Sequence, residues 1–432
     1  MTEAATRSSP SASPDVIVVG GGIVGTSAAA FLAGAGARVL LVEREALASA
    51  ASGANSGVVQ HPFDPVLARL YRESLARYRE LATSTNAFTI GDEPAGMLYA
   101  SPDEAAARRQ AAMIAGPFPE LHPEVLGGEA LRAIEPTVAP DLWACRVPIG
   151  YPVAPGSGTY AFATLAEARG VVVRVGRAAT LEVVGDRIVG VRVDGRVVPA
   201  GAVIAAAGPW TPDLLDPTGR WRPIAPLWGV VVEAELAAPP RHVLEEAGIE
   251  ASLDGAGKTA GGAAGGASLE AAGGTAGGAA GGAALGCGAE AGPREATGGA
   301  AGGANLAGEA ADGDGIEFSF IPQPGAGSVG STFLSSEPRA EAWIERILLR
   351  AMRFVPSMGD APIRGVRCCP RPQSVDGRPL IGAVPWLRNA FVCAGHGPWG
   401  VSTGPASGRL IADLVLGRDP AIPAELDPAR FA

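Results

Sequence analysis

The residues best suited to do chemistry lie near the C-terminus, in two stretches rich in glycine and proline. Arg371 stands in RGVRCCPRPQSVDG, and His396 stands in the glycine loop GHGPWG. A guanidinium binds a carboxylate through two parallel hydrogen bonds and does not lose its charge. A histidine changes its charge near neutral pH and can also hold a hydrogen bond beside a ligand. Arg371 could therefore bind an anion. His396 could carry a charge or hold a hydrogen bond beside a ligand. A surface ion pair and a backbone-bonded structural histidine are the alternatives.

A glycine cluster near the N-terminus could bind phosphate. Gly20, Gly22 and Gly25 form the pattern G-x-G-x-x-G directly after the apolar run at 16–19. The first glycine permits a tight turn, the second lets a pyrophosphate approach the backbone, and the third lets the next helix pack closely. The alanine-rich segment 23–35 is predicted to form that helix, and its first turn would direct free N–H groups at the phosphates.

A carboxylate follows at the distance that nucleotide-binding folds require. The predicted strand 38–42 ends at Glu43, eighteen residues after Gly25. A carboxylate there can accept hydrogen bonds from both ribose hydroxyls of an adenosine and would repel a 2′-phosphate. The strand, the glycine turn, the helix, the second strand and the acid follow one another at the spacing that such a unit requires. The sequence therefore predicts a dinucleotide site, with an ordinary βαβ unit that binds no ligand as the alternative.

Further helices and strands must hold these sites together. Apolar residues at helical spacing predict a helix at 65–83, and an amphipathic pattern predicts another at 340–354. Alternating residues around two Gly/Asp turns predict a β-meander at 180–198. A strand at 389–393, a glycine loop and a helix at 404–416 would present a second helix N-terminus to a ligand. Other strands are predicted at 171–175, 203–207, 228–236, 317–321 and 328–334, with a helix at 160–169.

Length and composition limit the class of protein. At 432 residues the chain should carry two domains, and with 47% hydrophobic residues it can build a large core. A net charge of −10 argues against nucleic acid or an anionic membrane as a partner. The five cysteines show no metal-ligand spacing, so we expect a reduced, cytoplasmic protein without a metal site. Residues 1–14 lack an apolar core and are predicted to be a disordered tail, not a signal peptide.

One segment departs from the rest in composition. Between 251 and 315 the sequence is mostly Gly and Ala, and TAGGAAGGA occurs at 259–267 and again at 275–283. The glycine pairs and the lack of an apolar face give this segment no reason to pack. We predict a disordered insertion between two strands, with a silk-like association segment as the alternative. The only lysine of the chain, Lys258, falls within it.

Four motifs in this order resemble the D-amino-acid oxidase superfamily of FAD flavoenzymes, and within it the glycine oxidase and sarcosine oxidase-like branch. They are the glycine fingerprint with Glu43, ASGANSG at 51–57, AAAGPW at 205–210, and RPQSVDGRPLIG followed by AGHGPWGVSTGPASG. The resemblance covers nearly the whole chain except the tail and the insertion. It implies an α/β fold with a doubly wound, Rossmann-like FAD domain and a second substrate domain built on a mostly antiparallel sheet. The FAD domain would be assembled from 15–85, 145–222 and 360–432, and the substrate domain from 86–144 and 223–359.

The resemblance also implies which residues contact the cofactor and the substrate. Arg371 takes the place of the arginine that binds the substrate carboxylate, and His396 matches a histidine beside the flavin ring. FAD would be held by Gly20, Gly22, Ile23, Val24, Gly25, Glu43, Arg44, Ser52, Asn55, Ser56, Gly57, Ala179, Ala207, Gly208, Trp210, Gly397, Trp399, Gly400, Val401 and Ser402.

By the same resemblance the reaction is FAD-dependent oxidation of the C–N bond of a D-amino acid, glycine or an N-alkyl amino acid. Hydride would pass to the flavin, and the resulting imine would hydrolyse to a 2-oxo acid. The electron acceptor would be O₂, or a quinone or carrier if the protein is a dehydrogenase on the same fold. A flavin-binding partner protein without turnover is the third alternative.

Two residues bear on how FAD is attached and on which electron acceptor the protein uses. Cys369 resembles the cysteine that bonds covalently to flavin in monomeric sarcosine oxidase, but Pro370 and Arg371 replace the residues that follow it there. We therefore expect a buried thiol and non-covalent FAD. Enzymes of this kind place a lysine ammonium by the flavin to activate O₂, whereas Lys258 lies in the insertion. An arginine or a protonated His396 would have to serve instead, so we expect slow reoxidation by O₂.

Overall fold

Two large sheets carry the fold. The computed structural model describes residues 13–249 and 315–432, and these all belong to one unit of the chain. The predicted insertion 251–315 and tail 1–14 lie outside the described residues, apart from their last one or two positions. In the described ranges no helix is both long enough and apolar enough to cross a membrane.

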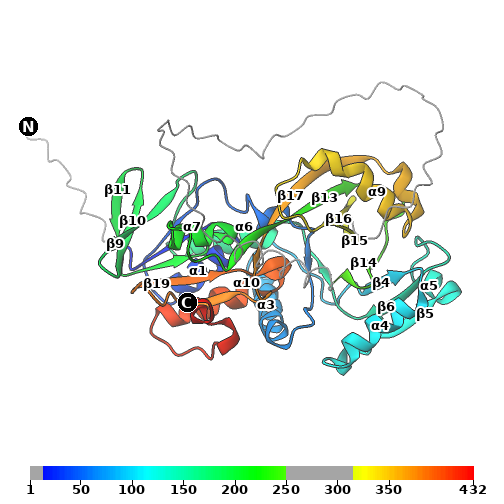
Figure 1. Ribbon diagram of the computed structural model, residues 1–432, viewed down its shortest axis with the longest axis horizontal. Coiled ribbons are helices and arrows are strands. Elements are labelled where there is room, and N and C mark those ends of the chain that lie inside the picture. The colour runs from blue at the N-terminus through cyan, green and yellow to red at the C-terminus, as the bar shows by residue number, and fades with distance from the viewer. Residues whose placement is uncertain (1–12, 250–314) are drawn as a thin grey trace, which may run out of the picture. The chain divides into compact units, whose positions relative to one another are not determined.

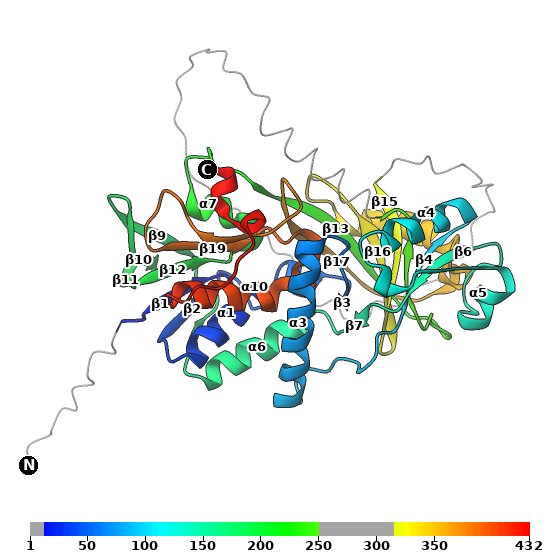
Figure 2. The same ribbon diagram turned by 90° about the horizontal axis from the view of Figure 1, so that it is seen from below.

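The first sheet has six strands, five of them parallel. Its order is β18-β19-β12-β1-β2-β8, and only β18 runs antiparallel to its neighbour. Helices α1, α6 and α10 lie on one side of this sheet (Figure 2). The strands are β1 (Val16–Val19), β2 (Val39–Val42), β8 (Val172–Arg174), β12 (Ala202–Ala205), β18 (Leu380–Ala383) and β19 (Ala390–Ala394). The helices are α1 (Ile23–Gly34), α6 (Ser157–Ala168) and α10 (Gly400–Val415).

Successive residues of these strands face opposite cores, as the strand period of two requires. Val16 and Val18 pack with the helices, whereas Ile17 and Val19 pack with the β-meander on the other side. The meander consists of β9 (Ala179–Val184), β10 (Arg187–Val193) and β11 (Arg196–Pro199), which pair in antiparallel fashion as predicted. Because both faces are covered, the strands are continuous apolar runs, and the predicted doubly wound fold is confirmed.

The second sheet has eight strands and is mostly antiparallel, as predicted. Its order is β17-β13-β16-β15-β14-β4-β6-β5, and only the β14–β4 pair is parallel (Figure 1). Helix α9 (Ile344–Met352) packs on one face, where Phe318 stacks on Phe354. The strands are β4 (Met97–Ser101), β5 (Glu124–Gly127), β6 (Trp143–Val147), β13 (Ile224–Ala234), β14 (Val243–Glu246), β15 (Ile316–Gln323), β16 (Ala326–Thr332) and β17 (Ile363–Ser374).

The remaining elements connect the two sheets or cover their edges. The helices are α2 (Ala51–Ala54), α3 (Pro65–Ser84), α4 (Glu104–Ala115), α5 (Gly128–Ile134) and α7 (Thr211–Leu215), and β3 (Val58–Val59) pairs with β7 (Tyr151–Pro152). The predicted helix at 340–354 is a 3₁₀ turn, Ala340–Trp343, followed by α9.

The predicted division into two domains stays a prediction. All strands of the six-stranded sheet fall within 15–85, 145–222 and 360–432. The eight-stranded sheet, however, takes β17 from the last of these segments and part of β6 from the second. A single boundary at residue 360 therefore does not separate the two sheets.

Helix α10 begins four residues earlier than predicted, at Gly400. Its start was predicted at about Gly404 from the sequence. A proline such as Pro405 is common in the first turn of a helix and unusual further in. Here Pro405 lies inside the helix, where its missing N–H frees the carbonyl of Val401. The buried hydroxyl of Tyr78 on α3 donates to that carbonyl at 2.8 Å. The tertiary contact replaces the lost helical hydrogen bond, so the helix continues through the proline.

A buried carboxylate fixes the start of β14. Glu135 is fully buried and accepts hydrogen bonds from the backbone N–H groups of Arg241 and His242, at 2.7 and 3.0 Å. It also bonds Nδ1 of His242 and the hydroxyl of Thr137, at 2.9 and 2.8 Å. Burial alone would raise the pKa of Glu135, but these hydrogen bonds outweigh burial and the net pKa is lowered. The carboxylate therefore stabilises the fold in its ionised form.

We expect Glu135→Gln to lower the free energy of unfolding by about 2 to 4 kcal/mol at neutral pH, because two backbone donors lose a charged acceptor. A carboxyl with a lowered folded-state pKa stabilises the protein above its unfolded pKa of about 4.3 and ceases to do so as pH falls through the folded value. The variant should therefore lose less stability than wild type between about pH 5 and pH 3. Denaturant unfolding over this range measures both effects. Glu129→Gln, at an exposed position on α5, is the control, and an equal effect there would contradict the assignment.

Candidate active site

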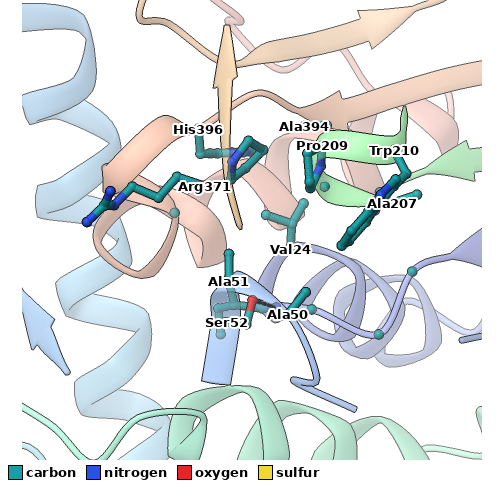
Figure 3. Close-up of a pocket in the computed structure, with 18 of the residues that line it drawn as sticks. Val24, Ala50, Ala51, Ser52, Ala207, Pro209, Trp210, Arg371, Ala394 and His396 are labelled. Atoms are coloured by element: carbon teal, nitrogen blue, oxygen red, sulfur yellow. Dashed lines mark hydrogen bonds between the residues drawn. The ribbon is translucent and has the colours of Figure 1, made fainter. Parts of the chain in front are cut away.

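A cavity of about 740 Å³ lies where the carboxyl ends of β1, β2 and β12 meet the N-termini of α1 and α10. Its walls also include α2 and the strands β13 to β17 of the eight-stranded sheet. In the close-up of Figure 3, Trp210 and the guanidinium of Arg371 are drawn at opposite ends of the view, with Ser52 and His396 between them. Every predicted site residue lines this cavity except Gly25.

Two of the three fingerprint glycines are required by close backbone contacts, and the third lies beside a side chain and the open cavity. Gly20 has φ of +122°, and a Cβ there would lie 2.2 Å from the carbonyl oxygen of Ala206. A Cβ on Gly25 would lie 2.0 Å from the carbonyl oxygen of Gly20, so Gly25 lets α1 approach the turn. At Gly22 the nearest atom would be the hydroxyl of Ser52, at 2.9 Å, and the backbone here is open to the cavity. The first-turn N–H groups of α1 thus reach a concave surface that suits phosphate.

Both carboxylate oxygens of Glu43 accept hydrogen bonds from backbone N–H groups, which hold the side chain in place. Oε2 accepts from the N–H of Gly21 at 2.6 Å, and Oε1 accepts from the N–H of Glu45 at 2.8 Å. The carboxylate therefore keeps one orientation at the wall of the cavity, where its other lone pairs can accept ribose hydroxyls. Beside it, the guanidinium of Arg44 lies 3.8 Å from the ring centroid of Trp210, which makes a flat cation–π surface for a planar group.

The N-terminus of α10 forms the opposite wall. Gly397, Trp399, Gly400, Val401 and Ser402 all line the cavity there. The hydroxyl of Ser402 accepts from the backbone N–H of Gln60 at 2.9 Å and so ties the wall to the segment after α2. Two helix N-termini, three close-contact glycines and an oriented carboxylate around one cavity fit a dinucleotide.

Arg371 crosses the eight-stranded sheet beneath the cavity. Its side chain starts on β17, yet Nη1 donates to the carbonyl of Thr332 at 2.8 Å and Nη2 donates to the hydroxyl of Ser331, both on β16. The residue is 8% exposed, and no carboxylate in residues 13–249 or 315–432 forms an ion pair with it. Burial lowers the pKa of Arg371, but arginine titrates so high that the side chain stays charged. A buried cation that borders a cavity without a protein counter-ion is suited to an anionic ligand.

Gly229, which was not predicted as a site residue, makes room for this guanidinium. It lies on β13, directly between β17 and β16 in the sheet. A Cβ at this position would lie 2.3 Å from Nη2 of Arg371 and 2.5 Å from Cζ. The signal was present in the sequence, because an isolated glycine inside a strand often marks a close approach of another group.

Burial disfavours a positive charge on His396, which the sequence suggested, with an arginine, as a possible cation. Burial lowers the pKa of His396 to about 3. The hydroxyl of Ser407 donates to the carbonyl of Thr403 at 2.9 Å, so its oxygen must accept from Nε2–H of His396, 3.0 Å away. The ring therefore carries its proton on Nε2, and Nδ1 is an acceptor. Lys258, which was set aside as a cation for the site, lies outside the described residues.

Cys369 also lines the cavity. Its thiol is buried, and Sγ lies 3.9 Å from the carbonyl of Ala51. Burial raises the pKa of Cys369, although Arg371 and Arg367 act in the opposite direction. A thiol with a raised pKa is a poor nucleophile at neutral pH, in keeping with the expectation of non-covalent FAD.

Comparison with known proteins agrees with this geometry. The family model described as FAD dependent oxidoreductase matches residues 15–414. The fold is similar to glycine oxidase from Bacillus cereus ATCC 14579, with a TM-score of 0.72, 22% identity, and 95% of this chain and 99% of that chain covered. Glycine oxidase from Geobacillus kaustophilus gives a TM-score of 0.73 at 20% identity, over 96% of this chain and 98% of that chain. L-proline dehydrogenase from P. horikoshii gives a TM-score of 0.72 at 17% identity, over 97% of this chain and 98% of that chain.

Proposed function

The chain belongs to the FAD-dependent oxidoreductase family, and from this premise we propose that it oxidises the C–N bond of an α-amino acid or an N-alkyl amino acid. FAD is its cofactor, and bound FAD supplies the two-electron acceptor for the reaction. The observation that carries the proposal is the buried guanidinium of Arg371 at the cavity wall, without an ion-pair partner among the described residues.

Arg371 would bind the substrate carboxylate and so orient the α-carbon. Two of its five N–H groups are fixed by Thr332 and Ser331, which hold the plane of the guanidinium. The other N–H groups are left for a carboxylate, which a guanidinium binds with two parallel bonds. Such positioning accounts for much of the rate when the chemistry itself belongs to a cofactor.

His396 would serve as a neutral wall of the site. Its ring is held by Ser407, and burial lowers its pKa to about 3, which favours the neutral form near neutral pH. The amine of the substrate must be neutral when the α-carbon loses its hydride. A neutral histidine does not give the amine a proton. Water then hydrolyses the released imine to a 2-oxo acid and an amine or ammonia.

We expect at least one α-amino acid to bleach the oxidised flavin band near about 450 nm when it is added to the holoenzyme without oxygen. The panel should include both enantiomers of the common amino acids, glycine and N-methylglycine. Matched amines that lack the carboxylate should bleach the band much more slowly, because they cannot bind Arg371. If no amino acid bleaches the flavin, or if amines without a carboxylate do so equally well, the proposed function is wrong.

A dehydrogenase with a quinone or carrier as electron acceptor is the second candidate. It is favoured by the neutral state of His396, which removes one of the cations that could stabilise superoxide. Admitting oxygenated buffer to the bleached samples distinguishes the two. Reoxidation that is slow compared with reduction supports the dehydrogenase, and fast reoxidation supports an oxidase.

A further inference from the structure

The hydroxyl of Ser331 on β16 has a hydrogen for which the described residues provide no acceptor. Arginine can only donate, so in the hydrogen bond between Nη2 of Arg371 and Ser331 the serine oxygen is the acceptor. The hydrogen of the same hydroxyl must therefore be donated elsewhere. Within residues 13–249 and 315–432, the bond from Arg371 is the one hydrogen bond of this side chain. Its donor capacity is thus left for another molecule.

Ser331 is nearly buried in the protein but borders the cavity. The residue is 5% exposed, and it lines the cavity together with Arg371 and Phe333. A buried hydroxyl that donates to nothing costs free energy, because it has lost its hydrogen bond to water. An acceptor that enters the cavity as part of a ligand would remove this cost. The position of Ser331 therefore suits a residue that binds a ligand.

The surroundings of the guanidinium bring such a ligand close to Ser331. A Cβ on Gly229 would lie 2.3 Å from Nη2 and 2.5 Å from both Cζ and Nη1, so the backbone of β13 packs against the guanidinium. The ring centroid of Phe333 lies 5.0 Å from Cζ, in a cation–π contact. Nη1 is also bonded to the carbonyl of Thr332. An anion that reaches Arg371 from the cavity must then lie beside Ser331, which is bonded to Nη2.

We propose that Ser331 donates its hydroxyl hydrogen to the substrate carboxylate that Arg371 binds, and is thus a second substrate-binding residue. This rests on the proposed function, which places the carboxylate on Arg371. An ionised carboxylate has about four lone-pair sites, so it accepts from the guanidinium and from the hydroxyl together. The bond from Arg371 polarises the hydroxyl and makes it a stronger donor, and a hydrogen bond to a charged acceptor is stronger than one between neutral groups.

The test measures how Ser331→Ala binds carboxylates that cannot react. Acetate, butanoate and benzoate are titrated into the holoenzyme, and binding is followed by the change in the flavin absorbance spectrum. For the ligand that binds wild type best, we expect the dissociation constant to rise about tenfold in Ser331→Ala. The KM for an amino-acid substrate should rise by a similar factor, with kcat within about twofold and the FAD content unchanged. A Ser331→Ala variant that binds as tightly as wild type would overturn the proposal.

Ser328→Ala is the matched control, because Ser328 is a serine of the same strand that also accepts from an arginine. Its hydroxyl accepts from Nη2 of Arg367 at 3.3 Å, and the residue is 2% exposed. It lies outside the cavity wall that the described residues form. Ser328→Ala should therefore bind the carboxylates like wild type. An equal loss in the two variants would show that any buried hydroxyl of β16 has this effect, and the proposal would fail.

A purely orienting role, in which Ser331 only fixes the plane of the guanidinium, predicts a different result in Arg371→Lys. A lysine ammonium has no plane to be fixed. If Ser331 donates to the carboxylate itself, adding Ser331→Ala to Arg371→Lys should weaken carboxylate binding by about the same factor as in wild type. No further loss in the double variant would overturn the proposal and leave the carboxylate site at Arg371 intact. If the wild-type holoenzyme binds none of the carboxylates, the proposed function itself fails, and the inference fails with it.

Discussion

We expect an alanine at position 25 to leave the purified protein without bound FAD. The added Cβ would lie 2.0 Å from the carbonyl oxygen of Gly20, and neither atom belongs to a flexible side chain that could move away. Helix α1 must shift from the turn, and its N–H groups then no longer point at the phosphates. We expect the dissociation constant for FAD to rise by at least about a hundredfold. Flavin absorbance after gel filtration, and titration of the apoprotein with FAD, measure the loss.

Two further variants separate loss of FAD from loss of fold. Gly22→Ala would meet only the side chain of Ser52, so the helix should stay in place while the phosphate approach is blocked. Gly116→Ala, at the end of α4, has its nearest neighbour at 3.7 Å and should keep full FAD content. A Gly25→Ala protein that retains FAD with wild-type affinity would show that close packing of α1 is not needed for the site.

Arg371→Lys should raise the KM for the amino-acid substrate by about thirty- to a hundredfold and leave the FAD content unchanged. Lysine keeps the charge, but it cannot bind a carboxylate with two parallel bonds and cannot reach Thr332 and Ser331 together. Steady-state kinetics with the best substrate of the panel, together with the flavin-to-protein absorbance ratio, gives both quantities. A KM close to wild type would remove Arg371 as the carboxylate-binding residue.

Gly229→Ala tests the same geometry without changing the arginine. Its Cβ would displace the guanidinium, so KM should rise although every charge remains. Gly365→Ala on β17 is the control, since its Cβ would only touch Glu233 at an ordinary 3.5 Å. If Gly229→Ala and Gly365→Ala behave alike, the path of Arg371 across the sheet does not matter for binding.

Local patterns predicted the parts of this protein whose structure is determined by nearby residues. The strand, glycine turn, helix and second strand from Val16 to Val42 follow from apolar runs and glycine spacing, and Glu43 lies where that unit requires it. The meander follows from its two Gly/Asp turns. In each case neighbours in the chain are also neighbours in space, so the sequence contains the whole signal.

Other parts depend on residues that are far apart in the chain. Strand β14 has only four residues and pairs in parallel with β4, which lies more than a hundred residues earlier, so this strand had no local signal. The charge of His396 depends on its burial under distant elements, which composition cannot reveal. The helix α10 continues through Pro405, and the carbonyl that the proline leaves free accepts from the hydroxyl of Tyr78 on a distant helix. Tertiary contacts decided all three.

The order of strands in the six-stranded sheet has a consequence for biosynthesis. Strand β12 lies between β1, made near the start of translation, and β19, made almost at the end. While the ribosome is still producing the residues between 206 and 389, β12 is an edge strand whose Val203 and Ile204 await a partner. Helix α10, one wall of the FAD cavity, follows later still. The cavity can therefore be completed only after α10 has been made, and until β19 pairs with it the edge of β12 is open to pairing with another chain.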